Sequence, residues 1–132
     1  MKKTFAVAVL GALILIASCS KTPADEYGAR IDRLISQDCH DGVYSQECAD
    51  LTKARYELAE EIKVDLGNRD QTPNIQNTTS VLRQLQSVWP EFKSRGCLTV
   101  PEDATSAYMC KTAAQLIESS TESLSMSIKK IA

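Results

Sequence analysis

Residues 105–130, TSAYMCKTAAQLIESSTESLSMSIKK, carry the clearest helical period in the chain. Apolar or small side chains recur in steps of three, four and seven, with Ser120 filling one gap, at Cys110, Ala113, Ile117, Leu124, Ile128 and Ile131. Such spacing places these side chains on one face of an α-helix. Lys129 and Lys130 suit the C-terminal end of a helix, where the backbone dipole favours positive charge. We therefore predict a long helix from about Thr105 to Lys130 with one buried stripe.

The segment before this helix predicts another helix, which contains a proline. Its apolar positions are spaced by threes and fours and comprise Val81, Leu82, Leu85, Val88, Trp89 and Phe92. We place its start at residues 77–80, because residues 68–77 are polar, include Thr72-Pro73 and lack a period. Pro90 removes one helix hydrogen bond and clashes with the carbonyl four residues earlier, at a cost of about 3 kcal/mol. A kink or break is therefore expected within residues 88–90.

The first half of the chain predicts two more helices. Residues 24–38 and 45–66 each carry apolar side chains at helical spacing, namely Tyr27, Ile31, Leu34 and Ile35 in the first and Cys48, Leu51, Leu58, Ile62 and Leu66 in the second. Ser45 is an acceptable N-cap, and Gly67-Asn68 is a stop signal. Strand-like alternation is missing from the sequence. We predict an all-α fold, a small four-helix domain made of two helix–loop–helix units.

The N-terminal segment resembles a bacterial lipoprotein signal peptide. Lys2 and Lys3 form a short basic start, residues 5–16 are almost wholly apolar, and Leu15-Ile16-Ala17-Ser18-Cys19 resembles a lipobox. Twelve helical residues cover only about 18 Å, which is short of the roughly 30 Å hydrocarbon core of a membrane. An ordinary cleaved secretory signal is the alternative.

The lipoprotein resemblance implies a division of the chain and a location. It gives a signal peptide over 1–18, a lipidated Cys19 with a tether through residue 25, and a helical domain over 26–132. Two or three acyl chains anchor a protein firmly to a membrane. We expect a bacterial cell-envelope protein, and Ser20 after the cysteine resembles the pattern that permits transfer to the outer membrane, periplasmic face, in a host with two membranes.

Four cysteines remain once Cys19 is assigned to lipid. They are Cys39, Cys48, Cys97 and Cys110, an even number in an exported chain. Three pairings exist, and we favour the local one, because Cys39–Cys48 and Cys97–Cys110 each flank one loop between two predicted helices. Each cross-link would contribute roughly 3 kcal/mol in the chain-entropy model. Spacings of nine and thirteen positions do not fit the tight cysteine pairs of structural zinc sites, so we expect no metal.

Charge and composition favour a binding protein over an enzyme. The net charge is −2 and falls to −4 once Lys2 and Lys3 are removed, which gives no argument for nucleic acid. The acidic side chains concentrate in residues 25–70, with twelve acidic against six basic residues. His40 is the only histidine, and its expected role is that of an exposed turn residue. We find no catalytic set and expect no cofactor.

The run from Leu82 to Cys97, LRQLQSVWPEFKSRGC, resembles the signature of the LprI-type lysozyme-inhibitor domain family. The matching residues are Leu82, Gln86, Trp89, Phe92, Lys93 and Cys97, and the family's further cysteines fit Cys110, Cys39 and Cys48. Pro90 departs from the family pattern, and the family's aspartate then leucine-asparagine element is missing from this sequence. The resemblance implies a small, helical, disulfide-stapled envelope domain. By themselves, Trp89 and Phe92 at a three-residue step favour core positions over a binding platform.

These observations predict a membrane-anchored binding module that inhibits a lysozyme-like muramidase. An acidic first half would steer the domain toward a basic lysozyme. The candidate contact is the Cys39–Cys48 loop, with Asp38, His40, Asp41 and Tyr44 exposed on a pre-organised ring. The alternative is a structural or interaction lipoprotein, such as an exclusion or immunity factor or an envelope-assembly subunit, which needs an exposed apolar patch instead.

Overall fold

A computed structural model of the chain describes residues 21–39 and 42–132. The helices of this part are α2 (Pro23–Ile35), α3 (Gln46–Gly67), α4 (Pro73–Ser94) and α5 (Ala104–Ile128), and no strand occurs in it. Disulfides join Cys39 to Cys48 and Cys97 to Cys110. The predicted all-α fold of two helix–loop–helix units, each with a local cross-link, is thereby confirmed.

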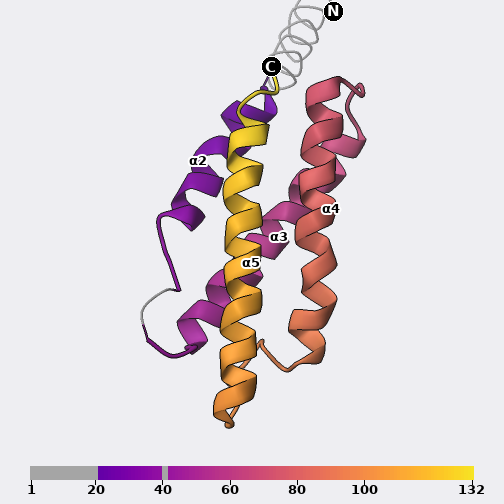
Figure 1. The fold of residues 1–132 in the computed structure, drawn as a ribbon. Coiled ribbons are helices and arrows are strands. Elements are labelled where there is room, and N and C mark those ends of the chain that lie inside the picture. The colour runs from indigo at the N-terminus through magenta and orange to yellow at the C-terminus, as the bar shows by residue number, and fades with distance from the viewer. Residues whose placement is uncertain (1–20, 40–41) are drawn as a thin grey trace, which may run out of the picture.

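The helix α5 is the centre of the arrangement, because it packs against all three of the others (Figure 1). Its predicted buried stripe is confirmed, and Ile117 and Ile128 are fully buried. The gap in the stripe is filled by Thr121, which is 1 % exposed, while Ser120 is only half-buried. The prediction for Ser120 is therefore wrong by one residue, since position 121 continues the step of four from Ile117.

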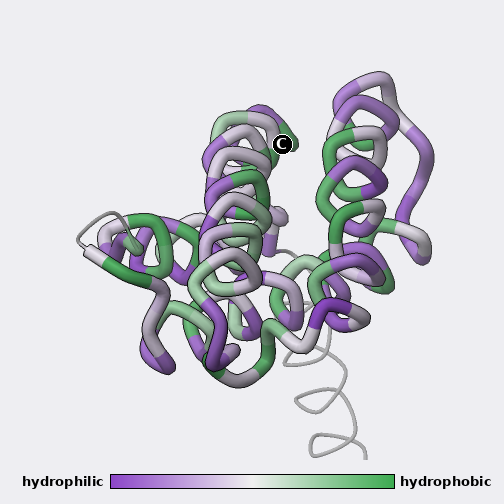
Figure 2. Tube along the Cα trace, turned by 60° about the horizontal axis from the view of Figure 1, so that its bottom comes forward, coloured by the Kyte–Doolittle hydropathy of each residue, from purple (hydrophilic) through white to green (hydrophobic). Residues whose placement is uncertain are grey.

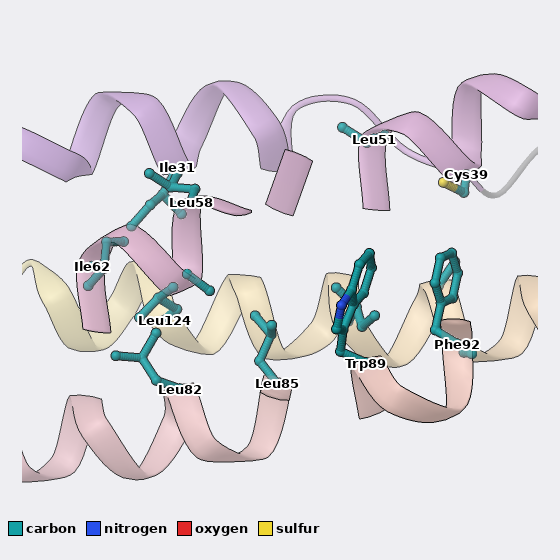
Figure 3. Packing of buried hydrophobic residues seen from close by; sticks show 14 of the residues in the cluster. Ile31, Cys39, Leu51, Leu58, Ile62, Leu82, Leu85, Trp89, Phe92 and Leu124 are labelled. Carbon is teal, nitrogen blue, oxygen red and sulfur yellow. The ribbon is translucent and has the colours of Figure 1, made fainter. Parts of the chain in front are cut away.

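One continuous core runs between the four helices (Figure 3). The helices α3, α4 and α5 supply most of it, and Leu58 of α3, Leu82 of α4 and Leu124 of α5 point into the same interior. All of the buried hydrophobic side chains in the described part lie between Tyr27 and Ile131. Because these side chains bury one another, we expect residues 21–132 to fold by themselves.

The helix α4 begins earlier than predicted. It starts at Pro73, where Thr72 is the N-cap and its side-chain oxygen accepts a hydrogen bond from the Ile75 N–H at 3.3 Å. A threonine N-cap followed by proline at the first helical position is a strong helix start, because the proline lacks only an N–H that would be unpaired there. The prediction that residues 68–77 form a long connection is wrong, since the loop ends at Thr72.

Pro90 does not break α4. The helix continues from Pro73 to Ser94 through the proline, so of the kink or break predicted within residues 88–90 the break is absent. Trp89 and Phe92, on either side of Pro90, are both buried in the core, while Pro90 itself is exposed. Burial of those two aromatic side chains offsets the cost of the missing hydrogen bond.

The outer helix ends differ from prediction by a turn or less. Thr22 caps α2 as Thr72 caps α4, and α2 therefore begins at Pro23. The tether predicted through residue 25 is too long, because Pro23, Ala24 and Asp25 belong to the helix. The helix α2 ends at Ile35, three residues before the predicted end. The helix α5 spans Ala104–Ile128, with Asp103 as its N-cap. The predicted N-cap Ser45 of α3 is confirmed.

The bundle has two distinct ends. Lys21 and the C-terminus lie at one end, which we call the terminal end, and the two cross-linked loops lie at the other, which we call the disulfide end (Figure 1). The 25 residues of α5 run between these ends, a length of about 37 Å. Within residues 21–39 and 42–132, none of the helices is long and apolar enough to cross a membrane. The predicted signal peptide and Cys19 lie outside the described residues.

Candidate functional site

The disulfide end is held by two cross-links and by hydrogen bonds between its loops. The Cα atoms are 5.2 Å apart in Cys39–Cys48 and 5.3 Å apart in Cys97–Cys110. The Tyr44 hydroxyl donates a hydrogen bond to the Cys97 carbonyl. Gln46 Nε2 donates another, of 3.0 Å, to the Leu98 carbonyl. The two helix–loop–helix units are therefore tied to one another at this end as well as through their core.

Tyr44 is a structural residue at the centre of the disulfide end. It is only 3 % exposed, and its ring meets Phe92 edge to face at a centroid distance of 6.5 Å. Burial raises the pKa of the Tyr44 phenol, because the phenolate would lose its hydration. The prediction that Tyr44 stands exposed on the first loop is therefore wrong. A buried hydroxyl needs a hydrogen-bond acceptor, and the Cys97 carbonyl of the second helix–loop–helix unit is that acceptor.

The other predicted contact residues of the first loop have different outcomes. Asp38 is exposed, as expected, just before Cys39. His40 and Asp41 lie outside the described residues. The loop returns through Gly42, whose φ of 76° lies in the left-handed region that glycine adopts at no steric cost. Of the four predicted residues, the structure therefore leaves Asp38 as the one described position on the surface.

Large apolar side chains are exposed around these loops. We define the disulfide-end apolar surface as Val43 of the first loop, Leu98 and Val100 of the second loop, and Tyr108 and Met109 of α5. Val43 is 85 % exposed and Tyr108 is 72 % exposed. Figure 2 turns this end toward the viewer and shows hydrophobic stretches along the loops. Clusters of this kind on soluble domains mark interaction sites more often than single exposed apolar residues do.

A groove of about 380 Å³ opens between the first loop and α5. Val43 and Gly42 form one wall, and Ala104, Tyr108 and Thr112 belong to the opposite wall. Lys111 donates a hydrogen bond from Nζ to the Gly42 carbonyl across this space. The groove therefore combines apolar walls with a cation that is fixed to the loop backbone, and the first loop is held against α5.

The residues that carry the resemblance motif are mainly core residues. Leu82, Trp89 and Phe92 are buried, and Lys93 is exposed. Gln86 donates a hydrogen bond from its amide to the Glu60 carboxylate. The predicted core role of Trp89 and Phe92 is confirmed.

Trp89 stacks with two other aromatic rings. It stacks on Tyr56 at a centroid distance of 4.1 Å with 7° between the ring planes, and on Phe92 at 5.3 Å. Offset and stacked aromatic pairs stabilise a core beyond the area they bury. The indole is buried, at 8 % exposure, and is part of the core.

Some carboxylates in the acidic first half of the chain form ion pairs with basic side chains of the same domain. Arg30 holds both oxygens of Glu61 at 2.8 and 2.7 Å, and Lys129 contacts Asp32 at 2.8 Å. The guanidinium of Arg30 lowers the pKa of Glu61 below its usual value. The groove between α2 and α3, of about 490 Å³, is lined by such charged side chains. These carboxylates are already engaged with cations of the same chain.

Arg55 and Glu118 form a buried ion pair that the helical pattern did not predict. Arg55 Nη1 lies 3.2 Å from Glu118 Oε2, and the two side chains are 0 % and 7 % exposed. Arg55 Nη2 also donates to the carbonyls of Leu34 and Gln37 at the end of α2. The sequence does contain a sign of this burial, because position 55 is a gap in the apolar pattern on the buried face of α3, between Leu51 and Leu58.

The described residues bring no metal site together. Over 21–39 and 42–132, no three His, Cys, Asp or Glu side chains gather closely enough to hold a metal ion. A comparison with models of known protein families, with curated proteins and with solved structures finds no match for this chain. The surfaces of the domain are therefore the features from which a function can be inferred.

Proposed function

We propose that this chain is a lipid-anchored envelope protein whose helical domain is a binding module, and that the disulfide end receives the partner. The observation that carries this proposal is the position of the disulfide-end apolar surface, at the end of the bundle remote from Lys21 (Figure 1). A lipid on Cys19 would hold the terminal end close to the membrane. The disulfide end would then face other envelope components.

The rigidity of the disulfide end supports a binding role. Two cross-links and the Tyr44 hydrogen bond hold the loops in one arrangement. A surface that is already ordered loses less conformational entropy when it binds a partner. Exposed apolar side chains such as Val43 and Tyr108 gain free energy when a partner removes them from water. The same features have no evident use in a domain that serves only as a spacer.

The first partner to test is a lysozyme-like muramidase. The LprI-type signature in residues 82–97 suggests this class, and the proposed anchor would place the domain beside peptidoglycan. The test compares inhibition of several lysozyme types by residues 21–132 and by two matched variants, Val43→Glu and Val64→Glu. Both valines are exposed, at 85 % and 65 %, but Val64 lies on α3 away from the disulfide end.

We expect inhibition by the unmodified domain and by Val64→Glu, and at least a tenfold weaker effect from Val43→Glu. An extra charge on an apolar contact must lose its hydration when the partner binds, and about 1.4 kcal/mol of such cost corresponds to tenfold. Absence of inhibition and of binding across all lysozyme types would remove the muramidase from the proposal.

The second candidate is an interaction lipoprotein, such as an exclusion or immunity factor or a subunit of an envelope assembly. The observation that favours it is the apolar character of the disulfide end, together with the engagement of Glu61 and Asp32 by Arg30 and Lys129. An apolar interface keeps its affinity as salt increases, whereas an electrostatic one weakens. Measuring the affinity for the captured partner at low and high ionic strength therefore separates this candidate from a charge-steered lysozyme complex.

The proposed anchor has its own test. Cells that express the full chain are labelled with a palmitate analogue, and their membranes are separated. We expect label on the protein and its recovery in the outer membrane of a host with two membranes, and we expect Cys19→Ser to lose the label. An unlabelled protein that is released by washing would contradict the anchor while leaving the binding role of the domain open to the assay above.

A further inference from the structure

The helix α5 carries a second stripe on its solvent-exposed side. The stripe consists of Met109, Thr112, Leu116, Ser119, Ser123 and Met126, in steps of three, four, three, four and three. Leu116 and Met126 are 54 % and 64 % exposed. A strict repeat of 3.5 residues is the period of a helix that packs along a second helix at a shallow angle. The stripe is about 25 Å long at 1.5 Å per residue.

A shallow groove accompanies this stripe on its α4 side. Two adjoining hollows of about 460 and 380 Å³ share Ser87, Val88 and Leu116, and together they extend from Arg95 to Ser123. The charged side chains that line them are Glu91 and Arg95, which are 2.7 Å apart and neutralise one another. A strip of surface without net charge thus follows α5 over most of its length.

We propose that a second copy of this chain packs on this strip, with the two α5 helices parallel and related by a two-fold axis along their length. In that arrangement Leu116 lies opposite Leu116 of the second copy, and Met109 and Met126 pair likewise at either end. The residues between them are small, as Thr112 and Ser119 are, so the two helix backbones can approach closely.

Charge is compatible with a second copy in this register. The positions that flank the stripe bring Gln115 opposite Ser120 and Glu122 opposite Ser127 of the other chain, so no two like charges meet. A surface that is complementary to itself is what a two-fold dimer requires. The groove between α2 and α3 is a poor alternative, since most of its lining is charged and includes Arg30, Arg33 and Glu57.

The parallel direction rests on the anchor of the proposed function. Parallel packing keeps both terminal ends on one side, where two lipid groups can enter the same membrane, and it sets two disulfide ends next to each other. An antiparallel pair would separate the anchors by the length of α5, about 37 Å. An interface along a strip of this length is small for a stable complex. Anchoring of both chains in one membrane offsets this, because it raises their effective concentration to about millimolar.

The test measures the mass of residues 21–132 by sedimentation, up to about 1 mM. We expect a dimer that Leu116→Glu weakens at least tenfold, because a two-fold interface contains each substitution twice. Leu116→Lys should weaken it equally, and an equimolar mixture of the two variants should recover a heterodimer. Val64→Glu, a substitution of an exposed apolar residue off the strip, should leave the dimer unchanged, and circular dichroism checks that every variant is folded.

Four results would overturn this inference. A chain that stays monomeric up to that concentration has no self-association on the strip, and a monomer that binds another protein through Leu116 assigns the strip to that protein instead. A dimer that tolerates Leu116→Glu uses another surface. Failure of the mixture to recover a heterodimer rejects the parallel register. Val43→Glu separates this inference from the proposed function, because it should remove the partner and retain the dimer.

Discussion

The terminal end and the disulfide end of this bundle are stabilised in different ways. At the terminal end, Arg69 reaches Asp65 at 3.0 Å and the Lys21 carbonyl at 3.3 Å, and Asn74 bonds the Lys130 carbonyl at 2.9 Å. At the disulfide end, two covalent cross-links and the buried Tyr44 hydroxyl hold the loops. The contacts at the first end come from polar side chains that water still reaches, whereas the second end combines buried contacts with the exposed Val43 and its apolar neighbours.

This difference shows how a small domain can present an apolar surface in water. The side chains that hold the terminal end together, such as Arg69 at 29 % exposure, are still partly accessible to water. At the disulfide end the stabilising groups are buried, since Cys97 and Cys110 are 0 % exposed and Tyr44 is 3 % exposed. The exposed apolar side chains there, such as Val43, take no part in the cross-links or in the Tyr44 hydrogen bond. They are available for recognition, and they can change without loss of the fold.

The largest expected effect comes from the polar contact inside the bundle. Arg55→Ala leaves Glu118 buried without its cation and frees the carbonyls at the end of α2, so we expect a loss of about 3–5 kcal/mol in the free energy of unfolding. The matched control is Arg30→Ala, whose pair with Glu61 is 45 % and 50 % exposed and should cost about 1 kcal/mol or less. Urea unfolding measures both, and equal losses would contradict the distinction between buried and exposed pairs.

Removal of one cross-link is the next largest change. Cys97→Ala with Cys110→Ala opens the second loop and should lower the free energy of unfolding by roughly 3 kcal/mol in the chain-entropy model. The paired removal of Cys39 and Cys48 should have an effect of similar size, because its loop is only slightly shorter. The measurement is urea unfolding under non-reducing conditions. An unchanged midpoint in both variants would show that the cross-links do not hold this end.

Tyr44→Phe tests the hydrogen bond between the two loops. The substitution keeps the ring against Phe92 and removes the donor to the Cys97 carbonyl, so about 1–3 kcal/mol of stability should be lost. Amide hydrogen exchange should accelerate in the Cys97–Cys110 loop and remain unchanged near Arg69. Uniform acceleration through the molecule would mean that Tyr44 supports the global core instead of this end.

The smallest expected effect concerns the terminal half of α5. Hydrogen bonds from Lys129 and Ser125 lower the pKa of Asp32 from its ordinary value of 3.8. A carboxyl whose folded pKa is depressed adds stability above its unfolded pKa, and this stability is lost as pH falls through the folded pKa. Asp32→Asn should therefore narrow the gap in Tm between neutral and acidic pH, and Lys129→Met should do the same. A steeper acid dependence in either variant would contradict this assignment.

The sequence predicted the four helices and the two cross-links because those depend on local information. Helical spacing identified the buried faces of α3, α4 and α5, and each cysteine pair flanked a single loop. The start of α4 differs from the prediction because Thr72-Pro73 is typical of a loop and equally of an N-cap followed by the first helical position.

The candidate site depends on contacts that the sequence does not encode locally. Tyr44 stands 53 positions from the carbonyl that it bonds, and Arg55 stands 63 positions from Glu118. An aromatic residue in a turn and an arginine in a helix are exposed in most proteins, so only assembly of the bundle reveals their burial. The disulfide-end apolar surface likewise joins Val43 with Tyr108, which are separate in the chain.

The most direct test of the central claim is a capture experiment from envelope extracts with three forms of the full chain. The unmodified protein, Val43→Glu and Val64→Glu are used as bait under oxidising conditions, and captured proteins are quantified by mass spectrometry. If the disulfide end is the binding surface, the unmodified chain and Val64→Glu enrich the same partner, and Val43→Glu loses it. Equal capture by Val43→Glu, or loss with Val64→Glu, would contradict the account.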